Sequence, residues 1–401
     1  MRRIVGLPLL LLGGLLACEG AVRYFEAVVP APSDTAYVPD AAAGYRLRPS
    51  GPADDPTADD HVNALGFRDR EHPPAKPAGA WRVLGIGDSF VYGAVPPREN
   101  FLAVAARELS TGPDAAEPVE MVLMGCPGWN TEHEVGIVRE LGPALAPDLI
   151  VLCFSIDTDV TGIPVRGRII QGNLLYVGAQ TPGLDALRRS RLFVLGEQVY
   201  LRRVTAAARR VVRALTGRLA PAGAPAGAPA GVAGAAPDTA FTPPTRHYLA
   251  RQLRLLPMFA PEPDARTAAL WREAERQLDL FADACRAAGA PWLLLVAPAE
   301  IQAEPRLRDA VLARAGRPPG ACDFELPQRR LAAWARARGV PLLDPLPDLR
   351  AARAGGRLYV PDNSHWNARG NALAGRLLAA ALAPRRAEEP RPAPEPRTGS
   401  R

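Results

Sequence analysis

The fold of this chain is decided by one stretch, Trp81-Arg82-Val83-Leu84-Gly85-Ile86-Gly87-Asp88-Ser89-Phe90-Val91-Tyr92-Gly93. Its apolar run is broken by glycine and followed by helix-forming residues from about Glu99, which predicts a buried parallel strand ending in a tight turn. Ser89 therefore lies just past the carboxyl end of a strand. In open α/β sheets that edge is where ligands bind.

A second stretch near the other end, Val360-Pro361-Asp362-Asn363-Ser364-His365-Trp366-Asn367, supplies the partners that a nucleophilic serine needs. Asp362 and His365 lie three residues apart, close enough for the carboxylate to hold the imidazole while the ring faces elsewhere. Nucleophile, base and orienting group are then all present.

These two blocks resemble the GDSL/SGNH hydrolase superfamily, through Gly87-Asp88-Ser89-Phe90 and Asp362-x-x-His365. Gly125-Cys126-Pro127-Gly128 resembles the second block of that family, and residues 63–69 resemble a lead-in found in its membrane-anchored bacterial branches. The resemblance covers about residues 63–382 outside one insert. An α/β-hydrolase is not expected, because its elbow needs a glycine where Val91 stands.

Alternating apolar and helical segments predict an α/β domain over residues 81–384. Five strands are expected near 83–86, 119–124, 149–154, 292–297 and 341–343, with helices near 99–110, 131–142, 269–288, 325–338 and 367–383. This alternation predicts a three-layer α/β/α domain around a five-stranded parallel sheet. The resemblance implies the flavodoxin-like strand order 2-1-3-4-5.

Residues 163–265 form a predicted insert inside this domain, with fourteen arginines against five acidic residues. A helical spacing there links Val204, Ala208, Val211 and Leu215, and an Ala/Pro/Gly linker follows at about 220–236. The arginines fit a solvated helix face, or a lid that meets anionic lipid or acidic polysaccharide. Residues 30–80 read as spacer and lead-in, and 385–401 as a disordered tail.

The N-terminus, residues 1–29, has the form of a signal sequence or membrane anchor. Met1-Arg2-Arg3 precedes an apolar run over 4–17, and Cys18 follows Leu15-Leu16-Ala17, which resembles a lipoprotein cleavage box. Lipidation at Cys18 and an uncleaved anchor are both open. Either one predicts an exported protein tethered to the membrane on its periplasmic or cell-surface side.

The resemblance implies roles for the site residues. His365 takes the Ser89 proton, Asp362 orients His365, and the backbone N–H groups of Ser89 and Gly125 stabilise the oxyanion. The family's third donor is an asparagine side chain, and Thr158 stands in its place here. Asn130 is a second candidate for that donor, with a helix cap as its alternative role.

No cofactor is predicted, because Gly85-Ile86-Gly87 lacks the third glycine of a dinucleotide turn. No metal site is predicted either, because the cysteine spacings fit none. Cys126, Cys153, Cys285 and Cys322 could form up to two disulfides, although Cys126 and Cys153 better fit small buried apolar residues. The basic insert lacks interleaved aromatic residues, so no nucleic-acid partner is expected.

The leading hypothesis is an exported, membrane-tethered serine esterase or acylhydrolase that cleaves a carboxylic ester through an acyl-serine intermediate. Its partners would be an ester-bearing small molecule, lipid or glycan, and the membrane through the N-terminus. The first alternative is an O-acyl (acetyl) transferase or deacetylase acting on envelope polysaccharide. The second is a non-catalytic envelope binding protein that keeps the fold.

Overall fold

The computed structural model describes residues 12–24, 36–111, 118–163, 165–170, 173–178, 187, 190, 192–193, 196 and 244–388. The chain divides into two compact units. One unit comprises Met1–Pro39 with Pro164–Ala230, and the other comprises Asp40–Ile163 with Gly231–Arg401. Except for Cys18, every predicted site residue belongs to the second unit.

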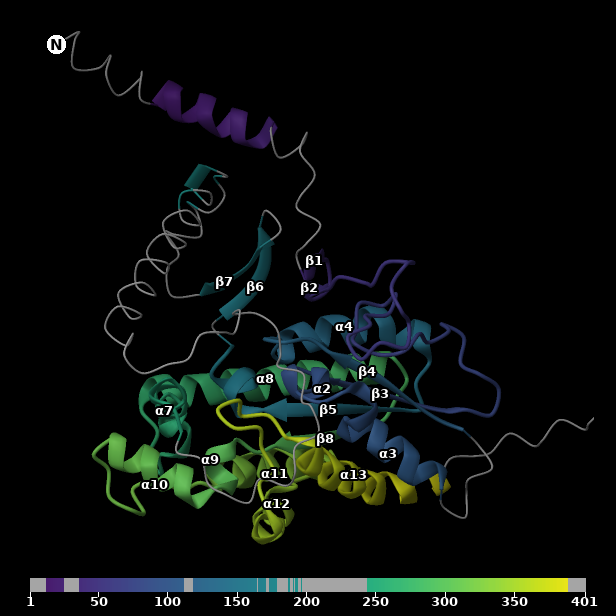
Figure 1. The fold of residues 1–401 in the computed structure, drawn as a ribbon, viewed down its shortest axis with the longest axis vertical. Coiled ribbons are helices and arrows are strands. Elements are labelled where there is room, and N and C mark those ends of the chain that lie inside the picture. The colour runs from purple at the N-terminus through teal and green to yellow at the C-terminus, as the bar shows by residue number, and fades with distance from the viewer. Residues whose placement is uncertain are drawn as a thin grey trace, which may run out of the picture. The chain divides into compact units, whose positions relative to one another are not determined.

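A five-stranded parallel sheet forms the centre of the second unit, with the strand order β4-β3-β5-β8-β9 (Figure 1). Its strands are β3 (Trp81–Gly87), β4 (Val119–Gly125), β5 (Leu149–Ser155), β8 (Trp292–Ala297) and β9 (Leu342–Leu343). Numbered along the chain within this sheet, the order is 2-1-3-4-5. The predicted architecture and strand order are therefore confirmed.

Helices cover both faces of this sheet, α4 and α8 on one side and α3 and α13 on the other (Figure 1). The helices of this unit are α2 (Ser89–Tyr92), α3 (Phe101–Ser110), α4 (Thr131–Leu145), α7 (Arg246–Leu253), α8 (Ala265–Ala287), α9 (Glu300–Ala303), α10 (Pro305–Arg314), α11 (Leu326–Arg338), α12 (Leu346–Ala352) and α13 (Ala368–Glu388). The helix predicted near 269–288 is α8, and its apolar face packs on the core, with Trp271, Leu278 and Phe281 almost fully buried.

Strand β3 is buried along its whole length because it lies inside the sheet and has helices on both faces. Gly85 sits in its middle for a steric reason. A Cβ at Gly85 would lie 2.2 Å from Cδ1 of Leu102, so the missing side chain lets α3 pack directly on the strand. The apolar run that predicted the strand therefore also sets the distance between sheet and helix.

Arg82 carries a fully buried charge within this apolar strand. Its Nε donates to Oε2 of Glu120 at 2.7 Å, and its Nη groups donate to the carbonyls of Pro73, Pro74 and Leu145 at 2.9 Å. The guanidinium thereby fastens the segment before β3 to the edge of the sheet. A buried charge is tolerated there because it is paired and hydrogen-bonded.

The lead-in residues 63–69 pack on this unit, and Phe67 is fully buried as its apolar side chain suggested. Arg68 has no carboxylate partner among the described residues. Its guanidinium donates to the backbone carbonyls of Asp59, Tyr92 and Gly93, and it lies over the Tyr92 ring. The lead-in thus meets the end of α2.

The predicted insert, residues 163–265, divides between the two units. Strands β6 (Val165–Ile170) and β7 (Asn173–Gly178) pair as an antiparallel hairpin in the first unit. Helix α7 and the short turn Leu256–Phe259 belong to the second unit. The predicted helix around Val204, the Ala/Pro/Gly linker and the tail beyond residue 388 lie outside the described residues.

In the first unit, residues 12–24 are helical, and Leu12, Leu15 and Leu16 are each more than half exposed. Within the described ranges, no helix combines the length and apolarity needed to cross a bilayer.

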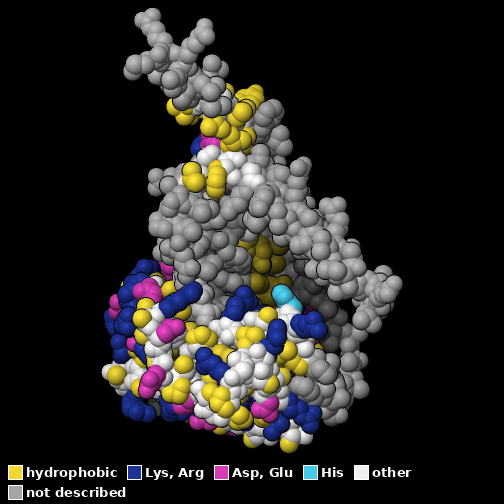
Figure 2. All heavy atoms as spheres, turned by 90° about the vertical axis from the view of Figure 1, so that its left-hand side faces the viewer, with side chains coloured by type: hydrophobic (Ala, Val, Ile, Leu, Met, Phe, Trp, Pro, Cys, Tyr) yellow, Lys and Arg dark blue, Asp and Glu magenta, His cyan; other side chains and the backbone are white. Residues whose placement is uncertain are grey.

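In Figure 2, basic side chains are scattered over the described part of the visible face among acidic and apolar ones. Strand β1 (Tyr37–Asp40) crosses the boundary between the units, and β2 (Gly44–Leu47) follows it.

Candidate active site

Ser89 is the first residue of α2, directly beyond the carboxyl end of β3. Asp88 caps this helix, because its Oδ1 accepts a hydrogen bond from the Phe90 N–H at 2.8 Å. The turn is tight. A Cβ at Gly87 would lie 3.0 Å from the carbonyl oxygen of Cys153 on the neighbouring strand. The half-buried Ser89 side chain is thereby held at the sheet edge where ligands bind.

His365 comes from the loop between α12 and α13. The loop is closed by a bond of 2.8 Å from the Val360 N–H to the His365 carbonyl, and by a bridge between Tyr359 and Trp366. Trp366 is almost fully buried, with its ring 5.1 Å from that of Phe90. An aromatic residue thus anchors the loop beside α2.

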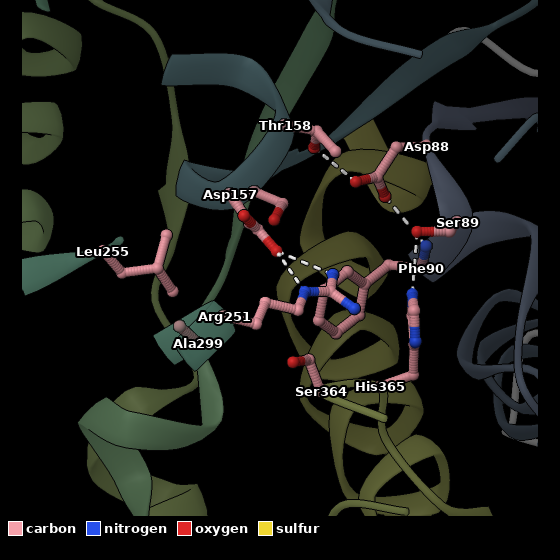
Figure 3. Close-up of a pocket in the computed structure, with 11 residues that line it drawn as sticks. Asp88, Ser89, Phe90, Asp157, Thr158, Arg251, Leu255, Ala299, Ser364 and His365 are labelled. Carbon is pink, nitrogen blue, oxygen red and sulfur yellow. Dashed lines mark hydrogen bonds and ion pairs between the residues drawn. The ribbon is translucent and has the colours of Figure 1, made fainter. Parts of the chain in front are cut away.

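The imidazole of His365 connects the two blocks. Its Nε2 lies 2.7 Å from Oγ of Ser89 (Figure 3). Its Nδ1 is hydrogen-bonded to Oδ1 of Asn363. An amide oxygen only accepts, so Nδ1 carries the proton and Nε2 presents its lone pair to the serine hydroxyl. This tautomer is the one a general base requires.

The environment of His365 keeps its ring neutral. Burial, aided by the positive charge of Arg251, lowers the pKa of His365 to about 4. The ring also packs on Phe90, with the two ring centroids 5.0 Å apart. At neutral pH the imidazole is therefore able to accept a proton.

Asp362, predicted to orient His365, does not contact it in this structure. Its Oδ1 accepts a hydrogen bond of 3.0 Å from the backbone N–H of Thr245, the residue that caps α7. Asp362 and Ser364 both have left-handed backbone conformations, with φ of 56° and 66°. This turn gives the position beside Nδ1 to Asn363, a residue that the sequence reasoning did not select.

The predicted oxyanion donors are not gathered as expected. Thr158 lines the pocket, but its hydroxyl donates to Oδ2 of Asp88. Asn130 caps α4, and its amide N–H₂ donates to the carbonyl of Gly162 at 3.3 Å. Its alternative role as a helix cap is thus confirmed.

Gly125 ends strand β4 and is absent from the pocket lining. A Cβ there would lie 2.2 Å from the backbone nitrogen of Tyr92. Close packing of α2 on the sheet edge therefore already requires glycine at this position. The backbone N–H of Ser89, by contrast, has no hydrogen-bond partner within the described part of the chain.

A pocket that is open to solvent lies over Ser89 and His365 (Figure 3). Its lining residues come from β5 and the loop after it, from α7 and from both catalytic blocks: Asp88, Ser89, Phe90, Ser155, Asp157, Thr158, Arg251, Leu255, Ala299, Ser364 and His365.

Helix α7 brings side chains to the pocket and to the histidine loop that the sequence analysis did not select. Arg251 forms an ion pair with Asp157, its Nη2 2.7 Å and its Nε 3.2 Å from the same carboxylate oxygen. Gln252 donates to Oγ of Ser364 at 3.0 Å. No sequence pattern links these residues to the stretches that carry Ser89 and His365, so only the tertiary fold brings them together.

Behind the histidine loop, a second network joins α7 to α9. Tyr248 donates to Glu300, and the Tyr248 hydroxyl lies 3.0 Å from Oγ of Ser364. Burial raises the pKa of Glu300 to about 7. Three bonds, from Thr245, Tyr248 and Gln252, therefore fasten α7 to the loop that carries His365.

Three acidic residues are buried beneath the serine turn. Burial raises the pKa of Asp88 to about 6, and it raises the pKa values of Asp159 and Glu134 well above their usual range. Asp159 accepts bonds from the Ser155 N–H and the Thr131 hydroxyl. Neither oxygen of Glu134 has a hydrogen-bond partner among the residues that the structure describes. No grouping suited to a metal ion occurs among the residues the structure describes.

All five cysteines are free thiols. Cys126 and Cys153 are fully buried, which confirms their predicted role as small apolar residues. Cys285 and Cys322 are also buried, whereas Cys18 is exposed.

No protein-family model and no curated protein matches this chain. Several solved structures resemble it at low identity. An acetyl xylan esterase is 12% identical, covering 75% of this chain and 99% of its own, with a TM-score of 0.38. A lipase/acylhydrolase from Enterococcus faecalis is 12% identical, covering 76% and 96%, with a TM-score of 0.36.

An acetylxylan esterase from Geobacillus stearothermophilus, crystallised as a catalytic mutant, is 11% identical. It covers 75% of this chain and 93% of its own, with a TM-score of 0.36. Such TM-scores and identities do not assign an activity, so the function is inferred from the site itself.

Proposed function

We propose that this chain is a serine esterase of the GDSL/SGNH type, which cleaves a carboxylic ester through an acyl-serine intermediate. The observation that carries this proposal is the 2.7 Å contact between His365 Nε2 and Ser89 Oγ within an open pocket. A partly buried, neutral imidazole beside a serine hydroxyl in the lining of a pocket is the arrangement that acyl transfer needs.

In the proposed reaction, Oγ of Ser89 attacks the ester carbonyl carbon while Nε2 of His365 takes the hydroxyl proton. The carbonyl electron pair moves to oxygen and forms a tetrahedral oxyanion. The C–O bond to the leaving alcohol then breaks, and His365 returns the proton to that alcohol. Water repeats the sequence on the acyl-serine and releases the acid.

Asn363 replaces the usual carboxylate behind the base in this account. Its amide oxygen holds Nδ1–H and so fixes the tautomer and the ring orientation. It provides no negative charge to offset the imidazolium that forms during the reaction. The imidazolium therefore forms without a carboxylate hydrogen-bonded to Nδ1, and the lowered pKa of His365 fits this arrangement.

We further propose that the enzyme is exported and tethered through its N-terminus. The basic start and apolar run support this placement, as do the exposed leucines of the helix over 12–24 and the free thiol of Cys18. Metabolic labelling with an alkyne fatty acid tests the tether: the full chain should incorporate it and Cys18→Ser should not. Equal incorporation by both proteins would reject lipidation at Cys18.

Hydrolysis of short chromogenic esters by the full chain tests the esterase proposal. Ser89→Ala and His365→Ala should each reduce kcat by about 10³-fold or more. Ser110→Ala removes a hydroxyl from the exposed surface of α3 and should behave as wild type. An esterase activity that survives Ser89→Ala would show that the site lies elsewhere.

A further inference from the structure

The proposed reaction places a negative charge on the former carbonyl oxygen, and this charge needs hydrogen-bond donors. The Ser89 N–H has no other partner in the described part of the chain and supplies one. The hydroxyl of Thr158 is occupied by Asp88, and the amide of Asn130 by Gly162. A further donor must therefore come from another group that lines the pocket.

Arg251 is the pocket residue that retains such donors. A guanidinium has five N–H groups, and Asp157 accepts from Nε and Nη2 only. For Nη1 there is no hydrogen-bond partner within the described residues. In Figure 3 the guanidinium reaches from α7 across the pocket, with Asp157 on one side and the Phe90 ring and His365 on the other.

The ion pair with Asp157 fixes this placement. Arg251 is only partly exposed, and both of its bonds end on one carboxylate oxygen, so the planar fork cannot rotate freely. The neighbouring Leu255 and Phe90 add apolar surface to the same pocket. A preorganised cation beside apolar surface stabilises a developing negative charge more strongly than water does.

We propose that Arg251 is a catalytic residue, whose guanidinium donates to the ester oxygen as its negative charge develops. This role rests on the proposed esterase function. Arg251 keeps its own protons throughout, while the serine proton passes to His365 and then to the leaving alcohol. Asp157 is a positioning residue, because it acts through Arg251. The loop after β5 thus still serves the oxyanion, but through an arginine brought in by α7.

The test measures kcat and KM of Arg251→Met and Arg251→Lys on a short neutral ester. We expect Arg251→Met to lower kcat by about 10²- to 10³-fold with little change in KM. Arg251→Lys, which keeps the charge, should recover part of that loss. Arg254→Met, an exposed arginine at the end of the same helix, should match wild type.

Two comparisons separate catalysis from a structural role. Asp157→Asn keeps an acceptor for the guanidinium and should lose less activity than Arg251→Met. Added guanidinium ion at millimolar concentration should restore activity to Arg251→Ala but not to Asp157→Ala. If Arg251→Met raises KM and leaves kcat unchanged, Arg251 only binds the substrate in its ground state. If Asp157→Asn lowers kcat as much as Arg251→Met does, Arg251 only holds the loop. Either result overturns the proposal.

The rate of Ser89 phosphonylation by a fluorophosphonate separates this inference from the esterase proposal. If wild type reacts at Ser89 and Arg251→Met reacts equally fast, the role of Arg251 is rejected while the esterase proposal stands. If folded wild type does not react, the esterase proposal fails, and the role of Arg251 fails with it.

Discussion

His365 directs its Nδ1 at the amide oxygen of Asn363, while the carboxylate of Asp362 accepts the backbone N–H of Thr245. The imidazole is thus oriented by a neutral group, and the nearest acidic residue in the sequence is bound to the start of α7. This arrangement fixes the tautomer of the base without placing a charge behind it. Substitutions at Asn363 and at Asp362 should therefore have different effects on catalysis.

Asn363→Ala should reduce kcat of ester hydrolysis by about 10²-fold or more, because the freed Nδ1 no longer selects the tautomer or the ring position. Asp362→Ala should change kcat by less than about threefold, since that carboxylate does not contact His365. Steady-state kinetics on both variants checks the assignment. An equal or larger loss in Asp362→Ala would return the orienting role to Asp362.

Asn363→Asp should move the pH dependence of kcat/KM. In wild type the base is neutral above its pKa of about 4, so activity should persist in mildly acidic buffer. A carboxylate beside Nδ1 stabilises the imidazolium and raises that pKa by about one unit or more. The acid limb of the profile should therefore shift to higher pH. An unshifted limb would show that residue 363 does not control the base.

Relative to wild type, Glu134→Met should be more stable at pH 8 than it is at pH 5. Burial holds the pKa of Glu134 well above its usual range, so the folded state resists ionisation while the unfolded chain ionises near pH 4.3. Glu134 alone therefore lowers the stability of wild type as pH rises above that value, by at most about 1.4 kcal/mol per pH unit. Methionine removes this penalty at similar volume.

Urea unfolding at the two pH values measures the effect on the free energy of unfolding. Glu108→Met, on the exposed face of α3, is the matched control, and its free energy of unfolding should differ from that of wild type by the same amount at both pH values. If Glu134→Met is more destabilising at pH 8 than at pH 5, the buried carboxyl must be ionised and paired in the folded protein.

Arg82→Met should destabilise the fold by about 3–5 kcal/mol, because it removes the buried donor to Oε2 of Glu120 and to several backbone carbonyls. The exposed Arg107→Met serves as the control. If urea unfolding shows that the free energy of unfolding falls by less than about 1 kcal/mol, Arg82 does not hold the segment before β3.

The sheet could be predicted because its strands are short apolar runs, and parallel strands buried on both faces leave that pattern. The meeting of Ser89 and His365 followed from their positions at one edge of that sheet. Family resemblance supplied the strand order, and the structure has the same order.

The details of the site could not be predicted because they depend on backbone conformation and on distant segments. The sequence does not show that Asp362 and Ser364 take left-handed conformations, which puts Asn363 rather than Asp362 beside the imidazole. Arg251 follows the insert, on a short helix whose spacing gives no sign that it meets Asp157. The hydroxyl of Thr158 pairs with Asp88, a contact between two different strand ends.

Covalent labelling with a fluorophosphonate measures whether His365 activates Ser89 as a nucleophile. Peptide mapping by mass spectrometry should place the phosphonyl group on Ser89 of the wild-type chain. Ser89→Ala and His365→Ala should remain unlabelled although folded, and Asp362→Ala should label like wild type. A folded wild-type protein that stays unlabelled, or labelling that persists in His365→Ala, would show that His365 does not activate Ser89.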